Sequence, residues 1–243
     1  MDSHLPELGL RHDSLSEQVH AAIREAIINK TLMPGSTVTE AQLAKDLGVS
    51  KTPVREALLR LREVGLVQPL ATRGVRVIEP TREAIVRAYE VRWVLDSATA
   101  QLAALRATRE HCAQLDEQAR QSLEAAKRYD AAGFSQWDRQ FHGTVWRAAS
   151  NPGLEWHADN AYALASALRA MDAPMGGDSI NCAQQHVGIA EAIREGQEQK
   201  AYDLAGRHVQ DVLRCVLPAD PLPADPQPQP GSPTQSRRAE VAP

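Results

Sequence analysis

Hydrophobic side chains recur every three or four residues in the first part of the chain, in separate runs at 15–27, 43–47 and 54–61. Residues spaced in this way lie on one face of an α-helix, so the pattern predicts three helices. Two short apolar runs follow at 65–70 and 74–78. The glycine that begins the second run suits a tight reversal between two strands. The chain is therefore predicted to begin with three helices and a two-stranded hairpin.

The ends of these helices carry capping patterns. Residues 14–17 (SLSE) and 39–42 (TEAQ) match the capping box, which places a helix N-terminus at each. Gly48 is suited to end the second helix in the left-handed conformation, and Ser50 or Thr52 is suited to cap the third. Two helices joined by so short a turn predict a helix-turn-helix, and the hairpin after it makes a winged helix that binds DNA.

Basic side chains are concentrated in and after the third predicted helix. Residues 51–76 contain six Lys or Arg and only two Glu, although the whole chain has a net charge of −4. This distribution is unlike that of a non-specific nucleic-acid coat protein and places positive charge where a winged helix meets phosphates. We expect the DNA contacts to come from the start of the third helix and the hairpin tip, namely Ser50, Lys51, Thr52, Arg55, Arg73 and Gly74.

The rest of the chain is rich in Ala and Leu and has the periodicity of packed helices. Breaks are expected near residues 107–108, 132–133, 151–153, 174–178 and 195–196. They predict six helices in an all-α antiparallel bundle, so the whole fold should be mainly α. Eight of the 15 prolines follow residue 217, and such a segment cannot bury a core. The expected units are a winged helix at 13–79, a helical bundle at 80–217 and a disordered tail at 218–243.

Cysteine usage and hydropathy indicate the compartment. The three cysteines are far apart and form no CxxC pair, which argues against a disulfide framework or a zinc ribbon. The sequence shows no signal peptide and no apolar run of transmembrane length. We expect a cytoplasmic protein without a membrane partner.

Four polar residues fall on otherwise apolar helix faces in the predicted bundle: Asp138, His142, His186 and His208. A buried carboxylate and three imidazoles are costly unless they satisfy one another, and a divalent metal ion does so directly. The alternative is that each is an ordinary hydrogen-bonded core residue. Four such residues on three helices favour the metal, with zinc or nickel expected first and manganese or iron also compatible.

The first domain resembles a known family. The string LGVSKTPVREALLRLREVGLV, followed by TRGVRV, is similar to the N-terminal domain of GntR-family bacterial transcription regulators over about residues 13–79. Lys51 stands where members usually carry Arg, and Lys cannot bind guanine through two hydrogen bonds as Arg does. Ala41 stands where the fatty-acid-responsive branch supplies a further Arg, so that contact is expected to be absent.

The second domain resembles the FCD ligand-binding domain, which accompanies this winged helix in FadR-type GntR regulators. The similar strings are YEVRWVLDSATAQLAA, DRQFHGTVWRAASNPGL, QQHVGIAEAIREG and AYDLAGRHV. The resemblance implies a metal held at Asp138, His142, His186 and His208. Six helices rather than seven favour the VanR-like subgroup. The fatty-acyl branch lacks the full metal set, so an acyl-CoA effector is disfavoured.

Arg92 is the candidate for binding an effector. It lies between apolar neighbours on the first helix of the bundle, and its guanidinium suits a carboxylate. The alternative is an ion pair with Asp96, one turn later. The resemblance favours the ligand role, because family members use an Arg in this helix to hold organic acids.

These patterns together predict a transcription regulator, with repression expected. It would act as a homodimer on a pseudo-palindromic double-stranded DNA operator, under the control of a small carboxylate bound near the metal. Two alternatives use the same residues. One is a metal-ion sensor without an organic effector, and the other is a metal-dependent enzyme fused to a DNA-binding domain. We expect no enzyme, since no general base or nucleophile motif accompanies the four ligands.

Overall fold

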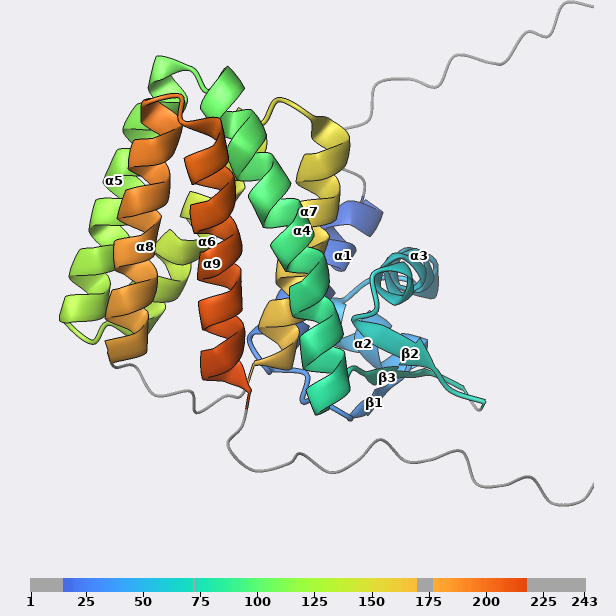
Figure 1. Cartoon of the computed structure of the whole chain (residues 1–243). Helices are drawn as coiled ribbons and strands as arrows, with labels where there is room; N and C mark the ends of the chain where they lie inside the picture. The colour runs from blue at the N-terminus through green and yellow to red at the C-terminus, as the bar shows by residue number, and fades with distance from the viewer. Residues whose placement is uncertain (1–14, 72, 170–176, 218–243) are drawn as a thin grey trace, which may run out of the picture.

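The computed structural model describes residues 15–71, 73–169 and 177–217. The first part contains α1 (Leu15–Ile28), β1 (Thr37–Val38), α2 (Glu40–Leu47), α3 (Lys51–Glu63), β2 (Val67–Pro69) and β3 (Val75–Val77). The second contains α4 (Arg82–Arg106), α5 (Arg109–Lys127), α6 (Ala131–Ala148), α7 (Pro152–Leu168), α8 (Gly177–Arg194) and α9 (Glu198–Val216). Figure 1 shows the later helices as a bundle with the first part packed against one side. The predicted fold class, a winged helix followed by an all-α domain, is confirmed.

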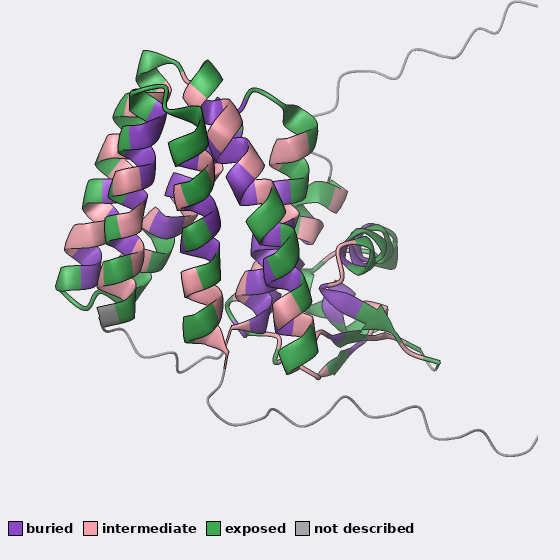
Figure 2. Cartoon of the chain, in the orientation of Figure 1, coloured by how far each residue is buried: buried purple, intermediate pink, exposed green. Residues whose placement is uncertain are grey.

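The apolar faces predicted for the first three helices form the core of the winged helix. Its fully buried members include Ile27 of α1, Val54 and Leu61 of α3. Purple segments in Figure 2 mark the buried inner faces. The predicted hairpin is present as β2 and β3, but β1 adds a third strand. The sheet has the order β1-β3-β2, and Thr37 of β1 pairs with Arg76 of β3. The extended residues before α2 supply the extra strand, because they satisfy the open edge of β3.

The helix caps are partly those predicted. Thr39 Oγ1 accepts a hydrogen bond from Gln42 N at 3.2 Å, but the Gln42 side chain donates to Asp46 instead of returning to Thr39. Gly48 ends α2 with φ 66°, as the left-handed cap requires. Ser50 occupies the N-cap of α3 without a capping hydrogen bond from its side chain. The other predicted capping box begins at Ser14, which lies outside the described residues. The predicted tail at 218–243 also lies outside them.

The break expected at 132–133 lies elsewhere. Helix α6 begins at Ala131, and the break falls at residues 128–130. Tyr129 takes a left-handed φ of 57°, and Asp130 Oδ1 accepts a hydrogen bond from Gly133 N at 2.9 Å. Gly133 therefore belongs to the first turn of the helix. A Cβ there would lie 2.2 Å from Asp130 Oδ2, so glycine accommodates the cap rather than breaking the chain.

Helices α4 and α9 pack closely because of one glycine. A Cβ at Gly206 of α9 would lie 2.8 Å from Ser97 Oγ and 2.9 Å from Trp93 Nε1, both on α4. A larger residue at 206 would require the Ser97 and Trp93 side chains to move, so glycine favours this close approach of the two helices. This places His208 of α9 in the same core as Arg92 of α4.

The winged helix is joined to the bundle through α1 and α7. Arg24 of α1 is buried, and its Nη2 donates to Asp159 Oδ2 at 2.7 Å and to the Asp159 carbonyl at 3.0 Å. Lys30 donates to the carbonyls of Ser166 and Ala167, at the C-terminal end of α7 where a cation is favoured. The two parts thus share a polar interface as well as apolar contacts.

No helix within the described residues combines the length and apolar character that crossing a membrane demands.

Candidate metal centre and nucleic-acid interface

The side chains predicted to meet DNA lie on the surface. Ser50, Lys51, Thr52 and Arg55 are exposed at the start of α3. In the β2–β3 hairpin Arg73 is exposed and Gly74 is half-buried, with φ 114°. A Cβ at Gly74 would lie 2.6 Å from the carbonyl oxygen of Val38, so this turn requires glycine. In Figure 1 α3 and the sheet lie on the side of the molecule away from α5 and α8.

Arg55 has a partner that the sequence pattern does not reveal. Its Nε and Nη2 donate to the two carboxylate oxygens of Glu40 at 3.0 and 2.9 Å. Both side chains are accessible, with 64% of Arg55 exposed, so solvent screens this pair. The pair holds the guanidinium between α2 and α3, and a base contact would compete with Glu40.

The four predicted ligands come together inside the bundle. Asp138 and His142 of α6, His186 of α8 and His208 of α9 are all buried. One nitrogen from each imidazole lies within 4.8 Å of those from the other two. His186 Nε2 is 3.5 Å from Asp138 Oδ1, and His142 Nε2 is 3.9 Å from the same oxygen. The residues therefore form one cluster from three helices.

Neighbouring side chains orient two of the rings. His208 Nδ1 lies 3.0 Å from Gln185 Oε1, and His186 Nδ1 lies 3.3 Å from Ser122 Oγ. Contacts of this kind to one ring nitrogen fix the orientation in which the other nitrogen is presented. Each Nε2 is thereby left for the centre of the cluster.

The remaining two members have contrasting partners. Asp138 Oδ2 accepts a hydrogen bond from the hydroxyl of Tyr162 on α7 at 2.5 Å. His142 Nε2 is buried and has no hydrogen-bond partner among the described residues. An unpartnered buried nitrogen is costly, and here it lies beside a carboxylate and two further imidazoles.

Burial sets the charges of the cluster. It lowers the pKa of His186 to about 4, and holds the pKa values of His142 and His208 well below the ordinary range. Burial alone would raise the pKa of Asp138, but His186 and Arg169 nearby lower it below its usual value. Neutral imidazoles beside a carboxylate are the donor set that a divalent cation requires.

Arg92 is buried and forms an ion pair with Asp96. Its Nε and Nη2 donate to Asp96 Oδ2 at 3.1 and 2.7 Å, and Trp146 Nε1 donates to the other oxygen at 3.2 Å. Arg92 Nη1 has no partner in the described part of the chain. The alternative contact considered from the sequence is thus present, and an effector contact by Arg92 stays a prediction.

Two cavities border the cluster. One of about 10 Å³ is lined by Asp96, His142 and His208 among others, and is close to the smallest space that holds a single water. The other, of about 200 Å³, is lined by Cys182 and Gln185, which contact the cluster, and by Arg169, whose Nε donates to the Tyr89 hydroxyl at 3.0 Å. Of these two, the second has room for an organic molecule; a further cavity of about 560 Å³, lined by Tyr162 and Arg169, lies towards α1.

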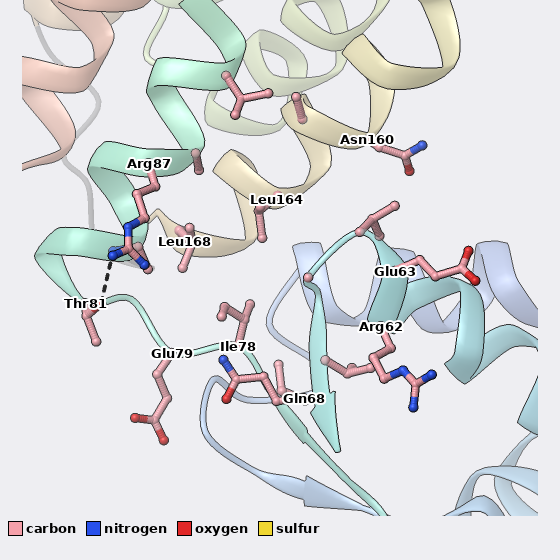
Figure 3. A pocket seen from close by; sticks show the side chains of 18 of the residues that line it. Arg62, Glu63, Gln68, Ile78, Glu79, Thr81, Arg87, Asn160, Leu164 and Leu168 are labelled. Atoms are coloured by element: carbon pink, nitrogen blue, oxygen red, sulfur yellow. Dashed lines mark hydrogen bonds between the residues drawn. The ribbon is translucent and has the colours of Figure 1, made fainter. Parts of the chain in front are cut away.

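A larger groove lies elsewhere, between the winged helix and helices α4 and α7 (Figure 3). It measures about 970 Å³ and is lined on one side by Gln68 and Ile78, on the other by Leu164 and Leu168. None of the four clustered residues lines it. The groove follows the contact between the winged helix and the bundle, whereas the four clustered polar residues are buried inside the bundle.

Several residues of this region escape sequence reasoning. Tyr162 of α7, Arg169 at the C-cap of α7 and Gln185 of α8 reach the cluster, and nothing in their local spacing indicates this. Cys182 does carry an indication, because it precedes His186 by one helical turn and so shares its face.

Both parts of the chain are similar to known protein families. Residues 15–77 match the family described as bacterial regulatory proteins, gntR family, and residues 87–211 match the FCD domain. The HTH-type transcriptional repressor RspR of Escherichia coli (strain K12) is 25% identical over 203 residues, covering 83% of this chain and 89% of that protein. A probable D-xylose utilization operon transcriptional repressor of Paenarthrobacter nicotinovorans is 30% identical over 207 residues, covering 82% and 88%.

Among solved structures, E. coli McbR/YncC superposes with a TM-score of 0.72 at 21% identity, covering 84% of this chain and 97% of that one. This likeness supports the fold. The relatives named with a function are transcriptional repressors, in agreement with a regulator rather than an enzyme. The chain belongs to the GntR family of bacterial transcriptional regulators and carries an FCD domain.

Proposed function

We propose that this transcriptional regulator holds a divalent metal ion at Asp138, His142, His186 and His208, and that a small organic acid bound beside the ion controls its affinity for operator DNA. The observation that carries the proposal is the unpartnered, buried Nε2 of His142. A cation satisfies this nitrogen together with the neighbouring imidazoles and the carboxylate, whereas no internal hydrogen bond in the described structure does.

The donor set favours zinc or nickel and is compatible with manganese or iron. Gln185 and Ser122 would keep the rings of His208 and His186 in their ligating orientation. When bound, the ion supplies a Lewis-acidic position for an oxygen of the acid. Side chains of the protein would make the other contacts to the acid.

The acid would occupy the cavity of about 200 Å³. This is smaller than the roughly 300–1,000 Å³ of drug-sized ligand sites, so it favours a compact molecule. Arg169 brings a guanidinium to the cavity, and a guanidinium binds carboxylate through paired hydrogen bonds. Arg92 has one Nη1 without a partner among the described residues, and it remains the residue that the sequence favours for binding the carboxylate of the acid.

Helix α7 would carry the effect to the DNA-binding domain. It bears Tyr162, which holds Asp138, and it also bears Asp159, which holds Arg24 of α1. Occupation of the cavity would shift α7 and with it the winged helix. A change in the spacing of two winged helices alters their fit to two half-sites.

The regulator would be a cytoplasmic homodimer that binds a pseudo-palindromic operator and represses transcription. Phosphate contacts would supply most of the binding energy, while Lys51, Thr52, Arg55 and the wing around Arg73 and Gly74 would discriminate between sequences, with Ser50 at the start of α3 beside them. The exposed Val91 and Trp156, which line one groove, supply apolar surface for a second copy. The two domains would span residues 13–79 and 80–217, and their six bundle helices favour the VanR-like subgroup.

Metal analysis and DNA binding test this proposal together. We expect about one ion per purified chain, and loss of it in His208→Ala but not in the control His157→Ala, which alters an exposed histidine. Full metal content in His208→Ala would refute the centre. The protein is then used to select DNA fragments from genomic DNA. Its affinity for these fragments is measured as metal alone, or metal with each of a panel of small carboxylic acids, is added.

The titration distinguishes the competing functions. A shift in DNA affinity that requires an acid supports the proposal. A shift caused by metal alone would make the protein a metal-ion sensor, and turnover of an acid would make it an enzyme.

A further inference from the structure

One oxygen of the cluster has three possible ligand atoms around it. Asp138 Oδ1 lies 3.5 Å from His186 Nε2, 3.9 Å from His142 Nε2 and 3.9 Å from the sulfur of Cys182. The Cys182 sulfur is also 4.0 Å from His186 Nε2. Cys182, Asp138 and His186 therefore satisfy the geometry of a metal-binding group in their own right.

These separations are close to those of a real coordination shell. With zinc bonds of about 2.0–2.2 Å to nitrogen or oxygen and 2.3 Å to sulfur, neighbouring donors of a five- or six-coordinate ion lie roughly 3.0–3.7 Å apart. The observed spacings of 3.5–4.0 Å around Asp138 Oδ1 and the Cys182 sulfur would shorten by about 1 Å or less on metal binding. The unpartnered His142 Nε2, buried and directed at the same oxygen, independently marks this point as a ligand position.

Cys182 also borders the cavity that admits the acid. It lies one turn before His186 on α8 and lines the space of about 200 Å³ together with Arg169 and Gln185. Its sulfur thus lies between the centre and that cavity. Cys215 lines the same cavity but belongs to neither metal-binding group found in the described residues.

We propose that Cys182 is a thiolate ligand of the metal held by Asp138 and the three histidines. The inference rests on the metal centre proposed above. As the metal–sulfur bond forms, the Cys182 S–H bond breaks and its proton passes to solvent. A soft sulfur ligand shifts the preference of the site towards zinc, cobalt or nickel and away from manganese, which favours oxygen ligands.

Cobalt(II) tests the assignment through its absorption spectrum. Metal-free protein is loaded with cobalt, and two regions are recorded: the visible d–d bands, which report bound cobalt, and the near-ultraviolet thiolate-to-cobalt charge-transfer band. We expect both in the wild type. Cys182→Ser should keep the d–d bands and lose the charge-transfer band, whereas the matched controls Cys112→Ser and Cys215→Ser should keep both.

The outcomes separate this inference from the proposed function. Absence of d–d bands in the wild type would overturn the metal centre itself. Visible bands without a charge-transfer band, or a charge-transfer band that survives Cys182→Ser, would leave the centre intact and overturn the role of Cys182.

A second measurement does not depend on folding of the variant. In wild-type protein, zinc should slow alkylation of Cys182 by iodoacetamide by roughly tenfold or more, while manganese at equal occupancy should protect less. Cys215, read by mass spectrometry in the same sample, is the internal control. Equal alkylation of Cys182 with and without zinc would contradict the proposal.

Discussion

At the scale of single residues, the metal centre depends on burial that keeps three imidazoles neutral. The pKa of His186 falls from 6.5 to about 4. An unfolded chain therefore binds protons between these pH values that the folded chain does not. By linkage, the free energy of unfolding of the metal-free protein must decrease as the pH falls through this window, and recover as it rises towards 6.5.

This dependence is measured by urea unfolding of chelator-treated protein from about pH 7 to about pH 4.5. We expect a shallower decline for His186→Asn than for the wild type, because one buried imidazole has been removed. The exposed control His157→Asn should follow the wild type. A wild-type stability that stays flat across the window would show that the cluster is not buried as described.

Arg55 and Glu40 give a paired prediction for the DNA surface. Arg55→Ala should weaken binding to selected DNA by about 1–3 kcal/mol if the guanidinium reads a base. Glu40→Gln should strengthen binding or leave it unchanged, because the two hydrogen bonds from Arg55 to the carboxylate are weakened and the guanidinium is released. Fluorescence anisotropy measures both variants. Equal weakening by both would mean that the ion pair itself, rather than free Arg55, is needed for docking.

At the scale of helices, close packing of α4 on α9 rests on Gly206. Gly206→Ala would place its Cβ 2.8 Å from Ser97 Oγ, and such overpacking typically costs about 1–3 kcal/mol of unfolding free energy. Gly188→Ala on α8 is the matched control. Its Cβ would meet Leu204 at 3.7 Å, an ordinary contact, and the helix gains up to about 1 kcal/mol from alanine. Equal effects on thermal unfolding would argue against the close approach of α4 and α9.

Helices and turns differ in how far the sequence predicts them. The stripes around Ile23, Val54 and Leu61 predict the buried faces because helical periodicity is a local property. Strand β1 was missing from the predicted hairpin, since its pairing with β3 is a long-range contact. Gly133 was misplaced because a glycine within a helix cap resembles a break.

The candidate site shows the same division. Asp138, His142, His186 and His208 stand out because polar residues on apolar stripes are visible along each helix. Their partners do not, since Tyr162 and Gln185 are brought to the cluster by the packing of separate helices. Arg92 was placed correctly in the core, yet whether it faces Asp96 or a ligand depends on that packing too.

At the scale of the whole molecule, α7 joins the metal centre to the winged helix. Asp159→Asn should weaken the bond to Arg24 and so reduce the response of DNA affinity to an acid, with metal content unchanged. Asp203→Asn on α9 is the control, because within the described residues this exposed side chain accepts a hydrogen bond from Gln199 of its own helix. A full response in Asp159→Asn would place the connection between the domains elsewhere.

The central claim is that binding of a small organic acid in the bundle and binding of DNA by the winged helix are coupled. The most direct measurement is the affinity of the metal-loaded protein for an acid from the panel, by calorimetry, with and without selected DNA. We expect the two affinities to differ by about 5–150-fold, and the acid to change DNA affinity by the same factor, as linkage requires. Identical affinities for every acid that binds, with and without DNA, would contradict the account.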